Sequence, residues 1–264
     1  MSGAGFRMER FSRTAVLTFD RPPAHVLDAT SLRELATQLD ALEADRDIST
    51  LVITGAGERF FCAGDDLNMY DGISPAVARE LTCLLAAVVT RLHDFSGLTL
   101  AAINGWCLGA GLECALACDI RIAERHARLG LPEGRVGLLP CGGGTATLAR
   151  QIGRGWAKRL ILCGETVDVE TAERIGLVEQ SVAGGESLPA ALALAQQAAR
   201  QSPTALAATK RLIDASQGAA LTKALASERA AFGTLFETAD AAEGVAAFLG
   251  KREPVWTHDR SRNR

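Results

Sequence analysis

Two glutamates, twenty residues apart, have the setting that most suggests chemistry. Glu113 lies in the apolar window GAGLECALACD, which predicts a helix that is buried nearly all round. Burial raises the pKa of a carboxyl group toward neutrality, where the group can act as a general acid or base. Glu133 lies between Pro132 and Gly134, which predict a fixed loop. Two such carboxyl groups on neighbouring elements could share one water molecule, with one taking a proton and the other giving one.

Each glutamate also has a structural interpretation. A buried Glu113 can satisfy a helix end or pair with an arginine, and this fits its window as well as a catalytic role does. Taken alone, Glu133 is typical of a surface loop. The two residues become informative only if the fold brings them together.

Small residues form two turns, Cys62-Ala63-Gly64 and Leu108-Gly109-Ala110-Gly111, each followed by a predicted helix start. Free N–H groups at such positions can hold a developing oxyanion, although tight turns or close helix packing explain the same residues. The second turn also begins like a dinucleotide-binding fingerprint, but Cys114 stands where Gly or Ala is needed. The glycine-rich segment 140–145 could form a ligand wall or a tight turn, and it lacks the lysine of a P-loop.

Strands and helices alternate in the first half of the chain. Buried strands are predicted at 15–19, 51–55, 98–103 and 119–123, and helices from about 28 to 45, 74 to 93 and 109 to 118. Everything after about residue 145 is predicted to be helical. This pattern indicates an α/β core with a helical C-terminal extension from about residue 190.

Composition excludes several classes of protein. The chain has 264 residues, 48% of them hydrophobic, and a net charge of −3, which indicates a globular protein without the electrostatic footprint of nucleic-acid binding. The seven cysteines are odd in number and scattered, which predicts reduced thiols without disulfides or a metal site. The N-terminal sequence lacks the apolar segment of a signal peptide, and no segment is predicted to cross a membrane, so we expect a cytoplasmic protein.

Three sequence blocks, in this order and at this spacing, resemble the crotonase superfamily of enoyl-CoA hydratases and isomerases. They are FFCAGDDL at 60–67, INGWCLGAGLECALACD at 103–119 and LGLPEGRVGLLPCGGGT at 129–145, with RPP at 21–23 and AERIGLV at 172–178. The resemblance covers nearly the whole chain. It implies a spiral of ββα turns over residues 1–189, which carries the acyl-CoA site. It also implies a helical region over 190–264 that mediates trimer formation, commonly as a dimer of trimers, and contributes to the CoA site.

The resemblance also assigns roles in the site. Glu113 and Glu133 match the two glutamates of hydratases, of which isomerases often keep only the second. Glu133 would give or take the proton at the α-carbon, and Glu113 would activate water for attack at the β-carbon. The backbone N–H groups of Ala63 and Ala110 would form the oxyanion hole for the thioester oxygen.

Further contacts with the substrate and CoA are implied at eleven positions. They are Ala24, His25, Cys62, Gly64, Asp66, Leu67, Gly109, Pro132, Gly142, Phe248 and Lys251. His25 replaces the more usual Asn, and Asp65 stands where Ala is frequent, which places an additional carboxylate beside the thioester. Met69, Tyr70, Ile73 and Trp106 are predicted to wall the acyl pocket.

The resulting expectation is a cytosolic enoyl-CoA hydratase that needs no metal or redox cofactor and forms a homotrimer or homohexamer. Nucleic acid and membrane are not expected as partners. The nearest alternative is another enolate reaction on the same scaffold, such as isomerisation, decarboxylation or retro-aldol cleavage. A non-catalytic acyl-CoA-binding assembly subunit is a second alternative, and a dinucleotide-dependent oxidoreductase is a third.

Overall fold

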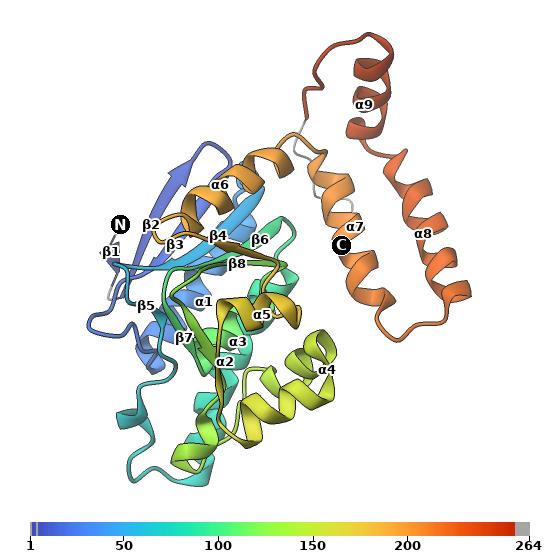
Figure 1. Cartoon of the computed structure of the whole chain (residues 1–264). Coiled ribbons are helices and arrows are strands. Elements are labelled where there is room, and N and C mark those ends of the chain that lie inside the picture. Colours follow the sequence, from blue (N-terminus) through green and yellow to red (C-terminus); the bar gives the residue numbers. More distant parts are fainter. Residues whose placement is uncertain (1, 4, 257–264) are drawn as a thin grey trace.

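Repeated strand-strand-helix units form the first two thirds of the chain (Figure 1). A computed structural model describes residues 2–3 and 5–256. Residues 1 and 4 of the predicted region 1–189, and residues 257–264 of the predicted region 190–264, lie outside the described residues. The elements before the first unit are β1 (Ser2–Gly3), β2 (Phe6–Phe11), β3 (Thr14–Phe19) and α1 (Ala29–Ala44).

Each unit places its first strand in one sheet and its second strand in another. The large sheet has seven strands in the order β1-β2-β3-β4-β6-β8-β11, and the small sheet has four in the order β10-β9-β7-β5. This alternation is the ββα spiral that the resemblance implied. The three units are β4 (Thr50–Gly55), β5 (Phe60–Cys62) and α2 (Pro75–Asp94); β6 (Leu98–Ile103), β7 (Trp106–Leu108) and α3 (Ala110–Ala117); and β8 (Ile120–Glu124), β9 (Arg128–Gly130) and α4 (Gly144–Leu162).

Local sequence explains where these elements form. β4 pairs in parallel with β3 and β6, and all six of its residues are buried, which fits the apolar run Leu51–Ile53 at its centre. Asp28 and Ser31 form a capping box at the start of α1. Ser74 caps α2, whose first residue is Pro75. The strands and helices predicted before residue 124 are confirmed at these positions.

The expectation that everything after residue 145 is helical is wrong at two strands. β10 (Thr166–Asp168) pairs with β9 in antiparallel orientation, and β11 (Gln180–Val182) pairs with β8 in parallel. They flank α5 (Val169–Arg174). Each strand has three residues, which is too short for an alternating pattern to be recognised in the sequence.

The C-terminal helices leave the core after α6 (Ser187–Ala198). Ala191 and Ala195 of α6 are fully buried against the large sheet, so the predicted boundary between residues 189 and 190 falls inside a helix of the core. By packing, the boundary lies between α6 and α7. The helices α7 (Pro203–Ser216), α8 (Leu221–Leu235) and α9 (Ala239–Leu249) extend away from the sheets (Figure 1). Within the described part of the chain, no helix has both the length and the apolar character needed to cross a bilayer.

Candidate active site

The predicted site residues meet at one edge of the small sheet. β5 and β7 are parallel neighbours, so the loops that follow them leave the sheet at the same edge. Gly64 in the first loop has a φ of 99°, and a Cβ there would lie 3.5 Å from the backbone nitrogen of Ala110. Gly109 in the second loop has a φ of 52°. Glycine is required at both turns because an L side chain is strained at such angles.

Glu113 lies in the first turn of α3 and is 2% exposed. Its Oε1 accepts hydrogen bonds from the N–H groups of Gly142 at 2.7 Å and Gly144 at 2.8 Å. Burial raises the pKa of Glu113, and the two N–H donors oppose that rise because they stabilise the carboxylate. The glycine-rich segment therefore anchors this carboxyl group.

Glu133 begins the short 3-10 helix η2 (Glu133–Val136). A Cβ on Gly109 would lie 3.5 Å from its Oε1, so this carboxyl group reaches the second turn. Its Oε2 is buried and has no hydrogen-bond partner among the residues that the structure describes. Burial, with a smaller contribution from the charges of Glu113 and Asp65, raises the pKa of Glu133 to about 7. The fold thus brings the two predicted glutamates together, and Glu133 lies at the site instead of on an outer surface.

The backbone N–H of Ala63 is not available to a ligand, which corrects the sequence-based assignment of this residue to the oxyanion hole. It donates to the carbonyl of Ala24 at 3.0 Å. Two residues further on, Asp65 forms a parallel bridge with Leu27, in which Leu27 donates to the Gly64 carbonyl and Asp66 donates to the Leu27 carbonyl.

In a parallel bridge the central residue directs its own N–H and C=O away from the partner strand. The Asp65 N–H therefore points away from Leu27. Among the described residues it has no hydrogen-bond acceptor. Ala110, the first residue of α3, likewise has no intrahelical acceptor for its N–H. Asp65 and Ala110 consequently each offer a free N–H group, one from each of the two loops.

The side chain of Asp65 places a third carboxyl group in the site. Its Oδ2 accepts a hydrogen bond from the Tyr70 hydroxyl at 2.8 Å, and its Oδ1 is buried without a described partner. Burial raises the pKa of Asp65, and the Tyr70 hydrogen bond opposes that rise. Tyr70, predicted as a wall residue, lies in the 3-10 helix η1 (Leu67–Tyr70) and contacts the site through this bond.

Cys141 is a site residue that the sequence did not single out. It lies beside Pro140 in the glycine-rich segment, and burial together with the charges of Glu113, Asp65 and Glu133 raises the pKa of its thiol to about 12. The thiol is therefore neutral at physiological pH. The glycine-rich segment predicts a ligand wall, so a wall residue at this position is foreseeable from the sequence. The three carboxyl groups beside the thiol are not foreseeable, because they come from other elements.

The predicted CoA contacts divide into two groups. Ala24 and His25 lie against the first loop, where buried His25 accepts from the Arg21 N–H through Nδ1 and contacts the Ala56 carbonyl through Nε2 at 2.9 Å. The group near this loop and the second turn comprises Ala24, His25, Cys62, Gly64, Asp66, Leu67, Gly109, Pro132 and Gly142. Phe248 and Lys251 lie at the end of α9, which Figure 1 places far from α3, and the fold of one chain does not bring them to the site.

A cavity of about 150 Å³ lies beside Glu113 between α2, α3 and α4. Val89, Thr90, Leu116 and Thr147 are among its lining residues. It has room for several water molecules or a short hydrocarbon segment. Over residues 2–3 and 5–256, no group of three or more His, Cys, Asp or Glu side chains is arranged to hold a metal ion.

The chain is similar in sequence and structure to known proteins. A family model described as enoyl-CoA hydratase/isomerase matches residues 9–259. The 2,3-dehydroadipyl-CoA hydratase of Escherichia coli (strain K12) is 41% identical over 248 residues, which are 94% of this chain and 96% of the relative. The short-chain-enoyl-CoA hydratase of Clostridium acetobutylicum is 35% identical over an alignment that covers 93% of this chain and 95% of the relative. A solved structure of Pseudomonas aeruginosa DspI is 50% identical, with a TM-score of 0.93, over 97% of this chain and 98% of that one.

Proposed function

The chain belongs to the enoyl-CoA hydratase/isomerase family, and we propose that it adds water across the double bond of a 2-enoyl-CoA. The observation that carries this proposal is the proximity of two carboxyl groups, buried Glu113 and partly buried Glu133, with Glu133 reaching a turn that offers a free N–H group. Hydration needs a base for water and an acid for the α-carbon, and the pair supplies both.

The first step is polarisation of the thioester. Its carbonyl oxygen accepts hydrogen bonds from the N–H groups of Asp65 and Ala110, which replace the originally expected pair of Ala63 and Ala110. Negative charge develops on this oxygen as the enolate forms. A donor of this kind contributes about 3 kcal/mol to the transition state.

The two glutamates then divide the proton transfers. The Glu113 carboxylate takes one proton of the water, and the oxygen forms its bond with the β-carbon. Glu133, whose pKa of about 7 keeps much of it protonated at neutral pH, gives its proton to the α-carbon. The thioester enolate collapses to the 3-hydroxyacyl-CoA, and exchange with solvent returns the proton from Glu113 to Glu133. No metal or redox cofactor takes part in this scheme.

The CoA portion of the substrate lies along the turn of Ala24 and His25. Phe248 and Lys251 would complete its site from another copy of the chain, where the Lys251 ammonium suits a phosphate.

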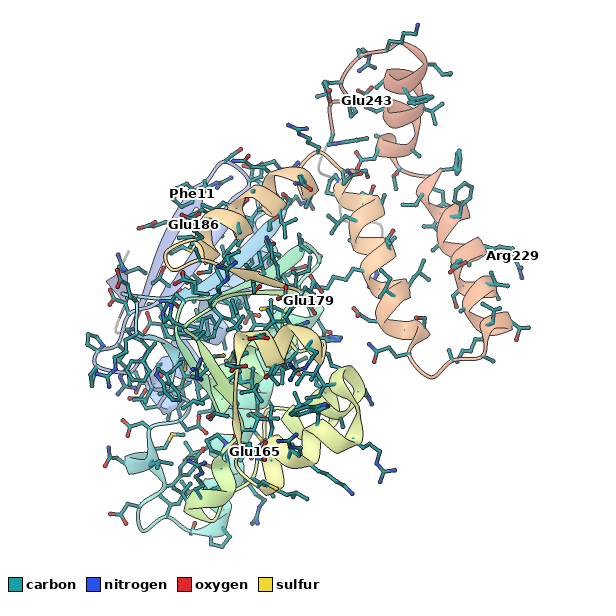
Figure 2. All side chains as sticks on the ribbon, in the orientation of Figure 1. Phe11, Glu165, Glu179, Glu186, Arg229 and Glu243 are labelled. Carbon is teal, nitrogen blue, oxygen red and sulfur yellow. The ribbon has the colours of Figure 1, made fainter. Side chains whose placement is uncertain are left out.

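The proposed assembly is a trimer, or a hexamer of two trimers, and the exposed C-terminal helices support an interface in this region. None of the residues of α8 is buried, and Phe232 and Phe236, whose rings contact each other, are each 65% exposed. Figure 2 shows the side chains of α8, Arg229 among them, projecting from a helix that packs mainly against α7. Exposed Leu221, Leu225, Phe232 and Phe236 give this region apolar surface, which is typical of an interface.

The test is the loss of the conjugated-thioester absorbance of crotonyl-CoA on addition of the purified protein. We expect rapid loss, and a decrease of at least about a hundredfold in both Glu113→Gln and Glu133→Gln. Variants that hydrate as fast as the parent would contradict the assigned roles. Product analysis with 2-enoyl, 3-enoyl and malonyl-type thioesters separates hydration from isomerisation and decarboxylation, and dehydroadipyl-CoA tests the substrate named for the Escherichia coli relative.

A further inference from the structure

Three carboxyl groups, on Asp65, Glu113 and Glu133, share the site: the charge of Asp65 raises the pKa of Glu113, and the charges of Glu113 and Asp65 raise the pKa of Glu133. Buried like charges in one site do not all ionise at neutral pH, so a proton must remain on one of them. The hydrogen-bond donors around the three groups determine which one. A donor that points at a carboxyl oxygen stabilises the charged form.

The donors are unequally distributed. Glu113 receives two N–H groups at Oε1. Asp65 receives the Tyr70 hydroxyl at Oδ2. Among the described residues, Glu133 accepts its own backbone N–H, and its Oε2, like Oδ1 of Asp65, is buried without a partner. The charges of Glu113 and Asp65 both raise the pKa of Glu133, whereas the Tyr70 hydroxyl opposes the rise in the pKa of Asp65. The carboxylates are therefore best placed on Glu113 and Asp65, and the proton on Glu133.

We propose that the Asp65 carboxylate, held by the Tyr70 hydroxyl, is a positioning residue for hydration that keeps the proton of the site on Glu133. The proposal rests on the hydratase function, because it concerns the acid of that reaction. Asp65 then contributes twice: its N–H binds the thioester oxygen, and its charge makes ionisation of Glu133 more costly. Its side chain acts through Glu133 and does not itself transfer a proton to the substrate.

The other titratable groups around Asp65 do not compete for this role. Tyr70 on η1 stays protonated, because burial and the neighbouring Asp65 charge raise its pKa. Burial raises the pKa of the thiols of Cys62 on β5 and Cys141 in the glycine-rich segment to about 12. Arg21, which lies beside the first loop, forms ion pairs with Asp28 and Asp66.

The first test compares pH profiles of kcat/KM for crotonyl-CoA hydration in the wild-type protein and in Asp65→Asn, which keeps the backbone N–H and the size of the side chain. We expect both limbs of the profile to move to lower pH, by roughly half a unit or more. Asp71→Asn, which removes an exposed charge from the same segment, should leave the profile in place. A merely structural role for Asp65 would lower the maximum without moving the limbs, and an unmoved profile would overturn the proposal.

Tyr70→Phe removes the donor that keeps Asp65 charged. The proton should then move from Glu133 to Asp65, and the loss of the Asp65 charge should lower the pKa of Glu133 by roughly the same half unit as in Asp65→Asn. Hydration at pH 7 should therefore fall about twofold while thermal unfolding stays near that of the wild type. Wild-type activity in this variant would contradict the role of the hydroxyl.

A measurement without turnover separates this inference from the proposed function. Infrared difference spectra should contain a protonated-carboxyl band that titrates near pH 7 and is absent from Glu133→Gln. In Asp65→Asn the band should titrate at lower pH. If the protein hydrates no enoyl-CoA but the band moves, the hydratase proposal fails and the proton assignment stands. If hydration occurs and the band does not move, the role of Asp65 is refuted.

Discussion

Replacing Ala110 with proline would remove one of the two proposed oxyanion donors with little effect on the helix. Ala110 is the first residue of α3, and the N–H of a first helical residue has no acceptor in the helix. Proline is favoured at that position because its φ suits the helix and its missing N–H costs no helical hydrogen bond. The N–H of Asp65 would remain as the sole donor. Loss of one such donor costs about 2.7–4 kcal/mol, so we expect kcat to fall by about 10²–10³-fold.

The assay is the initial rate of crotonyl-CoA hydration, with thermal unfolding measured in parallel. Ala29→Pro is the matched control, because Ala29 is the first residue of α1 and follows Asp28, whose extended backbone accommodates a following proline. The control should keep wild-type activity, and both variants should unfold within a few degrees of the wild type. Full activity in a folded Ala110→Pro protein would refute the assignment of this N–H to the thioester oxygen.

Three further outcomes follow from the packing and the charges. The pKa of Glu133 is raised from 4.5 to about 7, so the folded state binds its proton more tightly than the unfolded state, and the stability of the wild type falls as the pH rises through that interval. Glu133→Gln does not titrate, so between pH 5 and pH 8 its unfolding free energy should rise by about 1–2 kcal/mol relative to the wild type, after a discount for partial exposure. Filling the cavity with Val89→Phe should reduce hydration of longer enoyl chains about tenfold relative to crotonyl-CoA, whereas Ala86→Phe on the exposed side of α2 should not. Phe232→Glu should dissociate the proposed oligomer in light scattering, and an unchanged mass would show that α8 is not the interface.

The early strands and helices could be predicted because their signals are local. The segment 98–103 is one apolar run, and the helix that begins at Pro75 has its cap in Ser74. The strands at 166–168 and 180–182 could not be predicted, because what makes them strands is the edge of a sheet formed by distant residues. The same holds for α6, whose position on the large sheet depends on Val16 and Val52.

Prediction of the site was limited by contacts between loops. Glu113 was recognisable because burying a carboxylate in an apolar helix costs free energy unless hydrogen bonds or a charge compensate for it. The structure supplies the geometry that the sequence lacked, namely the hydrogen bonds from the N–H groups of Gly142 and Gly144. The resemblance to the crotonase superfamily is confirmed by the family model over residues 9–259. The resemblance assigned an oxyanion donor to the loop after β5, and the donor that we propose in that loop lies two residues after Ala63, whose own N–H is bonded to Ala24.

This difference of two residues has a physical cause. In the turn after β5, the sequence marks Ala63 and Gly64 as small, but small side chains do not decide which N–H is free. The parallel bridge to Leu27 does: it fixes Gly64 as acceptor and Asp66 as donor, and the Ala24 carbonyl takes the N–H of Ala63. Asp65 is the residue whose N–H remains, and it is also the residue whose side chain reaches Tyr70. A bridge to a residue thirty-eight positions away in sequence therefore sets both the free backbone donor and the third carboxyl group at the proposed substrate site.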